Sequence, residues 1–213
     1  MAGSPARRPR RKRAGQYHHG DLRRALIEQA LRTVDRLGVE GLTLRTVGEA
    51  LAVSRTALYR HFSSKQALVA AVASEGFRML RLALVGAWEQ GGRGRAGFEA
   101  MGEAYLRFAV AQPSYYRVMF GRFVESCARE PELVEEAEAA FQALVDALVD
   151  QQRDGLVRGD DPVAMARFVW SVTHGLAMLV IDGQLRDGEA AGLALNRYAS
   201  ERLRAAIAAT PAP

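Results

Sequence analysis

Apolar residues recur at helical spacing along almost the whole chain, and this pattern restricts the possible folds more than any other feature. No segment combines strict apolar–polar alternation with enough β-branched residues to predict a strand. We therefore predict an all-α fold of about nine helices. The expected helices cover residues 22–37, 44–51, 55–62, a long stretch from 65, 98–111, 115–123, 131–154, 162–181 and 189–209.

Short polar residues stand where several of these helices should begin. Their side-chain oxygens can accept hydrogen bonds from the free amides of a first helical turn. The expected N-caps are Asp21, Thr43, Ser54, Ser64 and Asp161. Residues 91–97 are rich in glycine and should separate two helices. They contain the pattern G-x-G-x-x-G, but a dinucleotide site needs a preceding strand, and a helix is expected there instead.

Basic residues are concentrated at the N-terminus. Six of the 29 basic residues lie between Arg7 and Arg13, whereas the first acidic residue is Asp21. A cationic tail broken by prolines is expected to be disordered on its own; it would either attract polyanions such as DNA or serve only as a solubilising segment. The expected organisation is a basic tail at residues 1–16, a first domain at 17–82 and a second domain at 83–213.

General features of the sequence favour a cytoplasmic protein. A hydrophobic content of 49% can fill a core. The single cysteine, Cys127, cannot form an internal disulfide, which fits a reducing compartment. No uninterrupted apolar run approaches the roughly 18 residues of a membrane-spanning helix, so no membrane partner is expected.

The two short helices expected at 44–51 and 55–62 have the spacing of a helix-turn-helix motif. Its apolar positions are spaced to pack against the first helix, at Leu44, Val47, Leu51, Val53 and Leu58. The second helix of such a pair can lie in the DNA major groove. The motif therefore predicts DNA binding, although spacing alone also occurs in helical proteins that bind no DNA.

Polar residues of the second helix carry the predicted DNA contacts. They are Arg55, Thr56, Tyr59, Arg60 and His61. An arginine such as Arg55 can donate two hydrogen bonds to guanine, and Thr56 can reach a base edge. The phenol of Tyr59, the imidazole of His61 and the ammonium of Lys65 suit the phosphate backbone better.

The residues around this motif resemble the DNA-binding domain of TetR-type repressors. The resemblance rests on Tyr-His-His-Gly-Asp-Leu-Arg at 17–23, Gly-Leu-Thr-Leu-Arg at 41–45, and Leu-Tyr-Arg-His-Phe-x-x-Lys-x-x-Leu at 58–68. It implies a three-helix DNA-binding unit, a helical ligand-binding domain, and a homodimer that leaves a palindromic operator when a small molecule binds. It also implies phosphate contacts from Thr43, Tyr59, His61 and Lys65 and base contacts from Arg45, Arg55 and Thr56. Ser54 and Arg60 complete the expected interface.

Two positions in the turn depart from the family pattern. The family usually has glycine where this chain has Ala52, and alanine where it has Gly48. If residue 52 needs a positive φ, alanine there costs about 1 kcal/mol. Glycine within a helix costs a similar amount, about 1 kcal/mol.

The second domain resembles a subgroup of this family that is marked by a tryptophan and a His-Gly pair. The resemblance covers residues 108–121, Trp170 and His174-Gly175, and does not indicate which ligand binds. Large apolar and aromatic residues of this domain could line a ligand cavity or simply form the core. The candidates are Tyr105, Phe108, Met119, Phe123, Phe141, Trp170, His174 and Met178. Since Tyr105 and His174 are the obvious polar candidates, we expect a largely apolar or aromatic ligand.

The last two long helices are the expected dimer seam. Their apolar stripes could form a four-helix bundle between two subunits or could pack only within one subunit. The predicted interface residues are Phe168, Val172, Leu176, Leu179, Leu195, Tyr198, Leu203 and Ile207.

No residue pattern predicts catalysis, a cofactor or a metal site. Nucleophile and base do not occur in a recognisable arrangement, and the adjacent His18 and His19 lack a nearby third ligand. A redox role for Cys127 would need a stabilised thiolate. The preferred hypothesis is a ligand-released repressor. The alternatives are a regulator that binds DNA without a ligand and a helical enzyme.

Deleting residues 1–13 tests the role of the basic tail. The deletion is expected to lower affinity on all DNA sequences alike and to flatten the dependence of affinity on salt, because fewer counterions are then released. Salt titrations with two unrelated duplexes measure both effects. An unchanged salt dependence would make the tail a bystander.

Overall fold

The structure is a computed structural model that describes residues 19–127, 129–185 and 188–209. The expected basic tail lies outside these residues. The described part contains ten helices and no strand, apart from one isolated bridge between Val157 and Ala208. The all-α prediction is therefore confirmed. The helices are α1 (His19–Leu37), α2 (Leu44–Ala50), α3 (Arg55–Tyr59), α4 (Lys65–Gln90), α5 (Gly94–Ala111), α6 (Pro113–Met119), α7 (Arg122–Glu125), α8 (Pro131–Arg153), α9 (Pro162–Ile181) and α10 (Gly188–Ile207).

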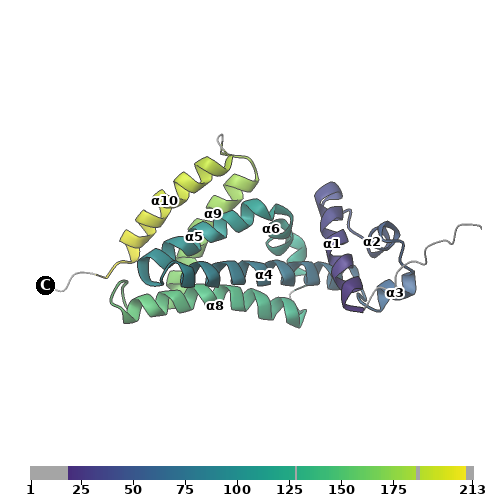
Figure 1. The fold of residues 1–213 in the computed structure, drawn as a ribbon, viewed down its shortest axis with the longest axis horizontal. Coiled ribbons are helices and arrows are strands. Elements are labelled where there is room, and N and C mark those ends of the chain that lie inside the picture. Colours follow the sequence, from purple (N-terminus) through teal and green to yellow (C-terminus); the bar gives the residue numbers. More distant parts are fainter. Residues whose placement is uncertain (1–18, 128, 186–187, 210–213) are drawn as a thin grey trace, which may run out of the picture.

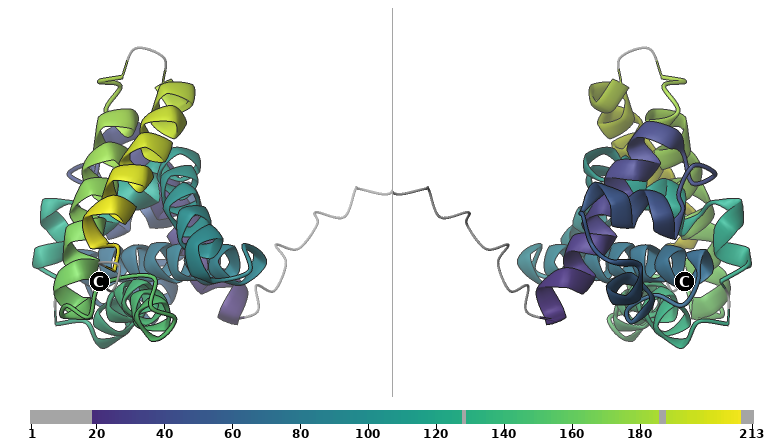
Figure 2. Two further views of the ribbon diagram at one scale, coloured as in Figure 1. Left: turned by 90° about the vertical axis from the view of Figure 1, so that its left-hand side faces the viewer. Right: turned by 90° about the vertical axis from the view of Figure 1, so that its right-hand side faces the viewer.

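Helices α1 to α3 form a small group at one end of the molecule (Figure 1). Helix α4 starts in that group and runs lengthwise through the rest of the protein, with α8 beside it. Helices α5, α9 and α10 pack on one another and complete the larger part, and the end views show α9 next to α10 (Figure 2). The short helices α6 and α7 lie where the two parts meet.

Four of the five expected N-caps are confirmed. Thr43, Ser54, Ser64 and Asp161 each accept a hydrogen bond from a backbone amide of the first turn that follows. The prediction for Asp21 was wrong, because α1 already begins at His19.

The helix expected at 115–123 is also different, because it is divided into α6 and α7. Pro113 occupies the first turn of α6, and extended backbone at Gly121 separates the two helices. This division accounts for the tenth helix.

Helix α4 contributes to both parts of the hydrophobic core. Its first half, including Leu68 and Val72, packs with α1 and α2 and with residues from α6, α8 and the segment between α7 and α8. Its second half, including Leu80 and Leu84, belongs to a core with α5, α6, α8 and α9. One continuous helix therefore connects the DNA-binding motif to the larger helical part.

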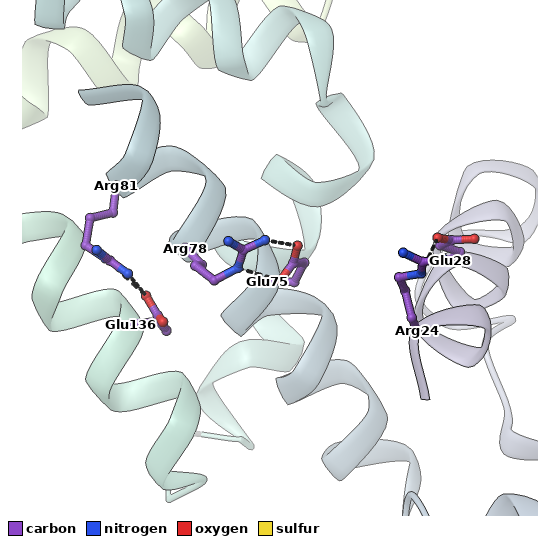
Figure 3. Close-up of polar contacts among 6 residues, drawn as sticks. All are labelled: Arg24, Glu28, Glu75, Arg78, Arg81 and Glu136. Atoms are coloured by element: carbon purple, nitrogen blue, oxygen red, sulfur yellow. Dashed lines mark hydrogen bonds and ion pairs between the residues drawn. The ribbon is translucent and has the colours of Figure 1, made fainter. Parts of the chain in front are cut away.

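Ion pairs at the edges of α4 accompany this packing. Arg81 of α4 contacts Glu136 of α8 at 3.2 Å, and both side chains are largely shielded from solvent (Figure 3). Arg78 pairs with Glu75 on α4 itself, and their hydrogen bond raises the pKa of Arg78. The pair of Arg24 and Glu28 on α1 is exposed, so we expect it to contribute little to stability.

Helix α9 is more apolar than its interrupted sequence suggests. Of the described helices it alone is long and apolar enough to cross a membrane by length and composition, with a mean hydropathy of 1.5. Because Arg167 and several polar residues lie among its apolar ones, it contains no long uninterrupted apolar run. In the fold, α9 packs against α5, α8 and α10, and 39% of its apolar window is buried. More than half of the window is therefore accessible in the single chain.

The turn between α2 and α3 holds alanine in a conformation that favours glycine. Ala52 has a φ of 53°. The expected strain at this position is therefore present. Gly48 is needed for a different reason: a Cβ atom there would lie 2.8 Å from Cδ1 of the buried Leu58. The second departure from the family pattern thus allows α3 to pack closely against α2.

Replacing Ala52 by glycine is expected to stabilise the protein. Glycine removes the strain of the left-handed conformation in the folded state, although it also makes the unfolded chain more flexible. Because the first effect is larger, we expect the free energy of unfolding to rise by about 0.5–1 kcal/mol. Urea denaturation measures the change. The Gly48→Ala variant is the matched control and should lose stability because Leu58 must move. Destabilisation by Ala52→Gly would contradict the interpretation.

Candidate DNA interface and ligand cavity

The outer surface of α3 presents polar side chains around a shallow depression. The depression is lined by Arg55, Thr56, Tyr59 and Arg60. Leu58, on the opposite side of the helix, is buried in the core and fixes which face points outward. The Tyr59 side chain is 46% exposed, and the Arg55 guanidinium carbon lies 5.4 Å from the centre of its ring. The structure therefore brings together four of the residues predicted to bind DNA.

Three further predicted residues flank α3 and already have local partners. The Thr43 hydroxyl accepts a hydrogen bond from the Thr46 amide at 3.0 Å, and the Ser54 hydroxyl accepts one from the Ala57 amide at 3.2 Å. Arg45 forms an exposed ion pair with Glu49 at 2.7 Å, and this hydrogen bond raises the pKa of Arg45. An exposed pair of this kind costs little to break, so Arg45 remains available to another acceptor.

Lys65 contacts residues outside the helix-turn-helix motif, and His61 also has a partner. The Lys65 ammonium donates a hydrogen bond to the Glu40 carbonyl oxygen at 3.2 Å and lies 4.9 Å from the centre of the Phe123 ring. His61 follows α3, is half-buried and also takes part in an interaction within the chain. If Lys65 binds a phosphate, its ammonium must therefore serve the phosphate in addition to Glu40, in the segment before α2, and Phe123 of α7.

A cavity of about 340 Å³ lies within the larger helical part. A cavity of this volume is within the range of small-molecule sites. Its wall consists almost entirely of apolar and aromatic side chains from several helices or their ends. The residues that line it are Phe77, Leu80, Leu84, Phe98, Met101, Gly102, Tyr105, Met119, Phe120, Val124, Ala137, Ala140, Phe141, Leu144, Val169, Trp170, Thr173, Ser200 and Leu203.

Half of the predicted ligand residues line this cavity. Tyr105, Met119, Phe141 and Trp170 do so. The other candidates do not line this cavity: Phe108 and Met178 pack in the second core, Phe123 packs against the first core, and His174 lies outside the wall, so their contact with a ligand stays a prediction. The contributions of α4 and α10 were not predicted, because apolar residues on helices carry no signal that separates a cavity wall from a core.

Four polar aromatic residues form a hydrogen-bonded chain beside the cavity. The Trp170 indole N–H donates to the Tyr105 oxygen at 3.1 Å, and the oxygens of Tyr105 and Tyr116 are 3.0 Å apart. His174 Nδ1 lies 2.6 Å from the Tyr116 oxygen and 3.1 Å from that of Tyr105. Since an indole N–H can only donate, a consistent arrangement runs from Trp170 through Tyr105 and Tyr116 to an unprotonated Nδ1 of His174.

Burial determines the protonation of this chain. It raises the pKa of Tyr105 to about 12 and also raises the pKa of Tyr116. Burial lowers the pKa of His174 below its ordinary value of 6.5. All three groups are therefore neutral near pH 7, and His174 serves as the acceptor at the end of the chain.

Residues of α6 and α7 reach from the cavity to the start of α4. Phe120 and Val124 line the cavity, and Phe123 between them contacts Lys65. Beyond α7, the Cys127 thiol donates to the Gln66 carbonyl oxygen at 3.4 Å. Cys127 is 1% exposed, so its thiol acts as a small buried packing residue rather than as an accessible redox group.

The outer faces of α9 and α10 carry exposed apolar side chains. Of the residues predicted to form a dimer seam, Phe168, Leu179, Leu195 and Tyr198 are exposed and Val172 is half-buried. Leu176, Leu203 and Ile207 are buried within the protomer, so their part in a seam stays a prediction. Their helical positions turn them toward α5 and α8 rather than toward solvent.

Comparisons with known proteins agree with this arrangement. Residues 26–72 match the family described as bacterial regulatory proteins, tetR family, and residues 98–203 match the tetracyclin repressor-like C-terminal domain. A protein with unknown function from Rhodococcus sp. RHA1 has a similar structure, with a TM-score of 0.80 and 33% identity over 90% of this chain and 98% of that one. This chain belongs to the TetR family of transcriptional regulators.

Other TetR-family proteins are similar over part of the sequence or in fold. The tetracycline repressor protein class C of Escherichia coli is 47% identical over 51 residues, which are 24% of this chain and about a quarter (23%) of that repressor. The TetR-family regulator PfmR from Thermus thermophilus has a TM-score of 0.64 and 20% identity, covering 83% of this chain and 97% of that one. DNA-binding regulators of this family are not enzymes, so the enzyme alternative is excluded. The subgroup marked by tryptophan and His-Gly stays a prediction.

Acidification is expected to destabilise this TetR-family protein through His174. Burial lowers the pKa of His174 in the folded state below its ordinary value of 6.5. The neutral imidazole therefore contributes fully to the free energy of unfolding above about pH 6.5, and this contribution is lost as the pH falls through the pKa of the folded state. A His174→Asn variant keeps an acceptor for the Tyr116 hydroxyl but does not titrate. Urea midpoints at pH 7.5 and 5.5 should fall less for this variant than for the wild type. Equal losses would contradict a neutral His174.

Proposed function

We propose that this TetR-family regulator is a repressor that binds a palindromic operator as a homodimer and is released by a small apolar or aromatic ligand. The exposed face of α3 is the observation that carries the DNA-binding half of the proposal. We place the protein in the cytoplasm, with a DNA-binding domain at residues 17–82 and a ligand-binding and dimerisation domain at 83–213.

The surface chemistry of α3 supports specific readout of DNA. Arg55 and Thr56 are exposed and have the chemistry for base edges in the major groove. Tyr59 and Arg60 extend the same surface and could reach phosphates. Ser54 retains a hydroxyl hydrogen for a phosphate oxygen while its own oxygen caps α3.

The apolar outer faces of α9 and α10 support a homodimer. Phe168 and Tyr198 are 48% and 60% exposed, which leaves large aromatic surface in water in a single chain. Pairing these helices with their copies would bury that surface in a four-helix bundle. A two-fold dimer would also present two α3 helices to half-sites separated by roughly 34–36 Å, one turn of DNA.

The path of α4 supports release by a ligand. Phe77, Leu80 and Leu84 of this helix line the cavity, and Lys65 at its start contacts both Glu40 and Phe123. A ligand that favours one position of α4 would change the separation of the two α3 helices. A coupling free energy of about 1–3 kcal/mol is enough to weaken operator binding 5- to 150-fold.

Selection of bound fragments from sheared genomic DNA tests the proposed operator binding. The wild type should enrich a palindrome, whereas an Arg55→Ala, Tyr59→Ala double variant should not, since it loses a base reader and a phosphate contact. Each lost contact is expected to cost about 1–3 kcal/mol. Binding to the selected duplex, measured by fluorescence anisotropy, quantifies the loss.

An Arg153→Ala variant is the control for charge. Arg153 is exposed at the end of α8, so its removal lowers the net charge without altering α3. It should retain the palindrome. If an intact wild-type dimer enriches no sequence, or if the double variant enriches the same palindrome equally well, the proposed operator readout is wrong.

A further inference from the structure

Most polar groups around the cavity are already committed to partners within the protein. The Tyr105 oxygen lies within 3.1 Å of polar atoms of Trp170, Tyr116 and His174, which leaves little capacity for a ligand. The Thr173 hydroxyl donates to the Val169 carbonyl oxygen at 3.0 Å. The tyrosine side of the cavity therefore offers ring surfaces rather than free hydrogen-bonding groups.

Two polar side chains of α10 have no such partner. Ser200 lines the cavity, and Asn196 lies one helical turn before it. Asn196 is 5% exposed, yet neither its amide nor the Ser200 hydroxyl forms a hydrogen bond with any part of the chain that the structure describes. The amide atoms of Asn196 are not fully enclosed, however, so they keep some accessible surface at which a polar group can reach them.

Gly102 leaves the space between these groups and the cavity open. A Cβ atom at Gly102 would lie 3.5 Å from the Ser200 hydroxyl oxygen, 3.8 Å from Asn196 Nδ2 and 3.9 Å from Asn196 Oδ1. Gly102 itself lines the cavity. Ser200 is therefore reached directly from the cavity, whereas Asn196 is not part of the wall and would be reached past the bare backbone of Gly102.

Two ion pairs flank this polar end. Glu99 of α5, one turn before Gly102, forms an ion pair with Arg204 of α10, one turn after Ser200. Glu103 pairs with Arg107 on α5. Arg204 and Arg107 are thus taken up by acidic partners, and Arg197, next to Asn196, is exposed to solvent, so a neutral polar group fits this end better than a carboxylate.

We propose that the cavity binds a compact aromatic or alicyclic molecule carrying one neutral hydrogen-bonding group, and that Ser200 and Asn196 hold this group. The inference rests on the proposed function, which makes the cavity an effector site. It assigns the hydrogen bonds to the ligand to side chains of α10, whereas the sequence had indicated Tyr105 and His174. The Asn196 amide can donate and accept, so a hydroxyl, ketone or amide satisfies it, whereas a hydrocarbon leaves it unpaired.

Three probes with the same ring system test the inference on the full-length protein. They are 2-naphthol, 2-methylnaphthalene and 2-naphthoate, which place a hydroxyl, a methyl group and a carboxylate on the same ring system. Equilibrium dialysis measures each dissociation constant. We expect 2-naphthol to bind about tenfold more tightly than 2-methylnaphthalene, as one or two neutral hydrogen bonds allow, and 2-naphthoate to bind weakest.

Single-group variants locate the contact that distinguishes the probes. Ser200→Ala and Asn196→Leu should each reduce the preference for 2-naphthol over 2-methylnaphthalene. The affinity for 2-methylnaphthalene itself should stay nearly unchanged, and this retained binding shows that the variant is folded. Thr173→Val is the matched control, because it removes a cavity hydroxyl that is already bonded to the backbone. If Asn196→Leu fails to fold, Ser200→Ala alone decides.

The outcomes separate this inference from the proposed function. If the probes bind but the preference survives in Ser200→Ala and Asn196→Leu, or is lost in Thr173→Val, the assignment to α10 is wrong and the effector site stands. Tighter binding of 2-naphthoate than of 2-naphthol would overturn the neutral ligand class. If none of the probes binds saturably, the inference fails together with the ligand half of the proposed function, while operator binding is judged by its own experiment.

Discussion

The packing of α4 into two cores is the constraint on which the rest of the structure depends. Leu68 and Val72 fix its first half against α1 and α2, and Leu80 and Leu84 fix its second half against the larger helical part. An α-helix of 26 residues resists bending because each turn is held by backbone hydrogen bonds. A shift of its cavity-lining half would therefore be carried to the helix-turn-helix motif.

Helices α6 and α7 provide a second connection between the same two regions. Val124 lines the cavity while the adjacent Phe123 contacts Lys65, the first residue of α4. At the other side of the junction, Arg23 of α1 pairs with Glu132 of α8, and Ser114 of α6 hydrogen-bonds with Asp35 of α1. Several contacts besides α4 thus join the helix-turn-helix part to the larger helical part, and in the proposed mechanism a change in cavity shape acts through more than one of them.

Local signals in the sequence were sufficient for most helices and for the face of α3. A Ser or Thr cap, a proline in a first turn and an apolar stripe act over a few residues, so Thr43, Ser64 and Leu58 could be assigned from the sequence. Tertiary contacts could not. Leu176 and Phe168 belong to the same apolar helix, yet one is buried and the other exposed, because that difference depends on where α5 and α8 lie. The internal partners of Tyr105 were hidden for the same reason.

Helix α9 links the cavity to the proposed dimer seam. Val169, Trp170 and Thr173 face the cavity, while Phe168 and Leu179 lie on the exposed side of the same helix. A cavity wall and a dimer interface both require apolar residues, which would explain why α9 is apolar on more than one face. In the proposed dimer, a ligand that displaces Trp170 would press on a helix that is also held by the partner subunit. Any movement would then be directed toward the parts of the cavity wall that do not belong to the seam, which are contributed by α4, α5, α8 and the region of α6 and α7.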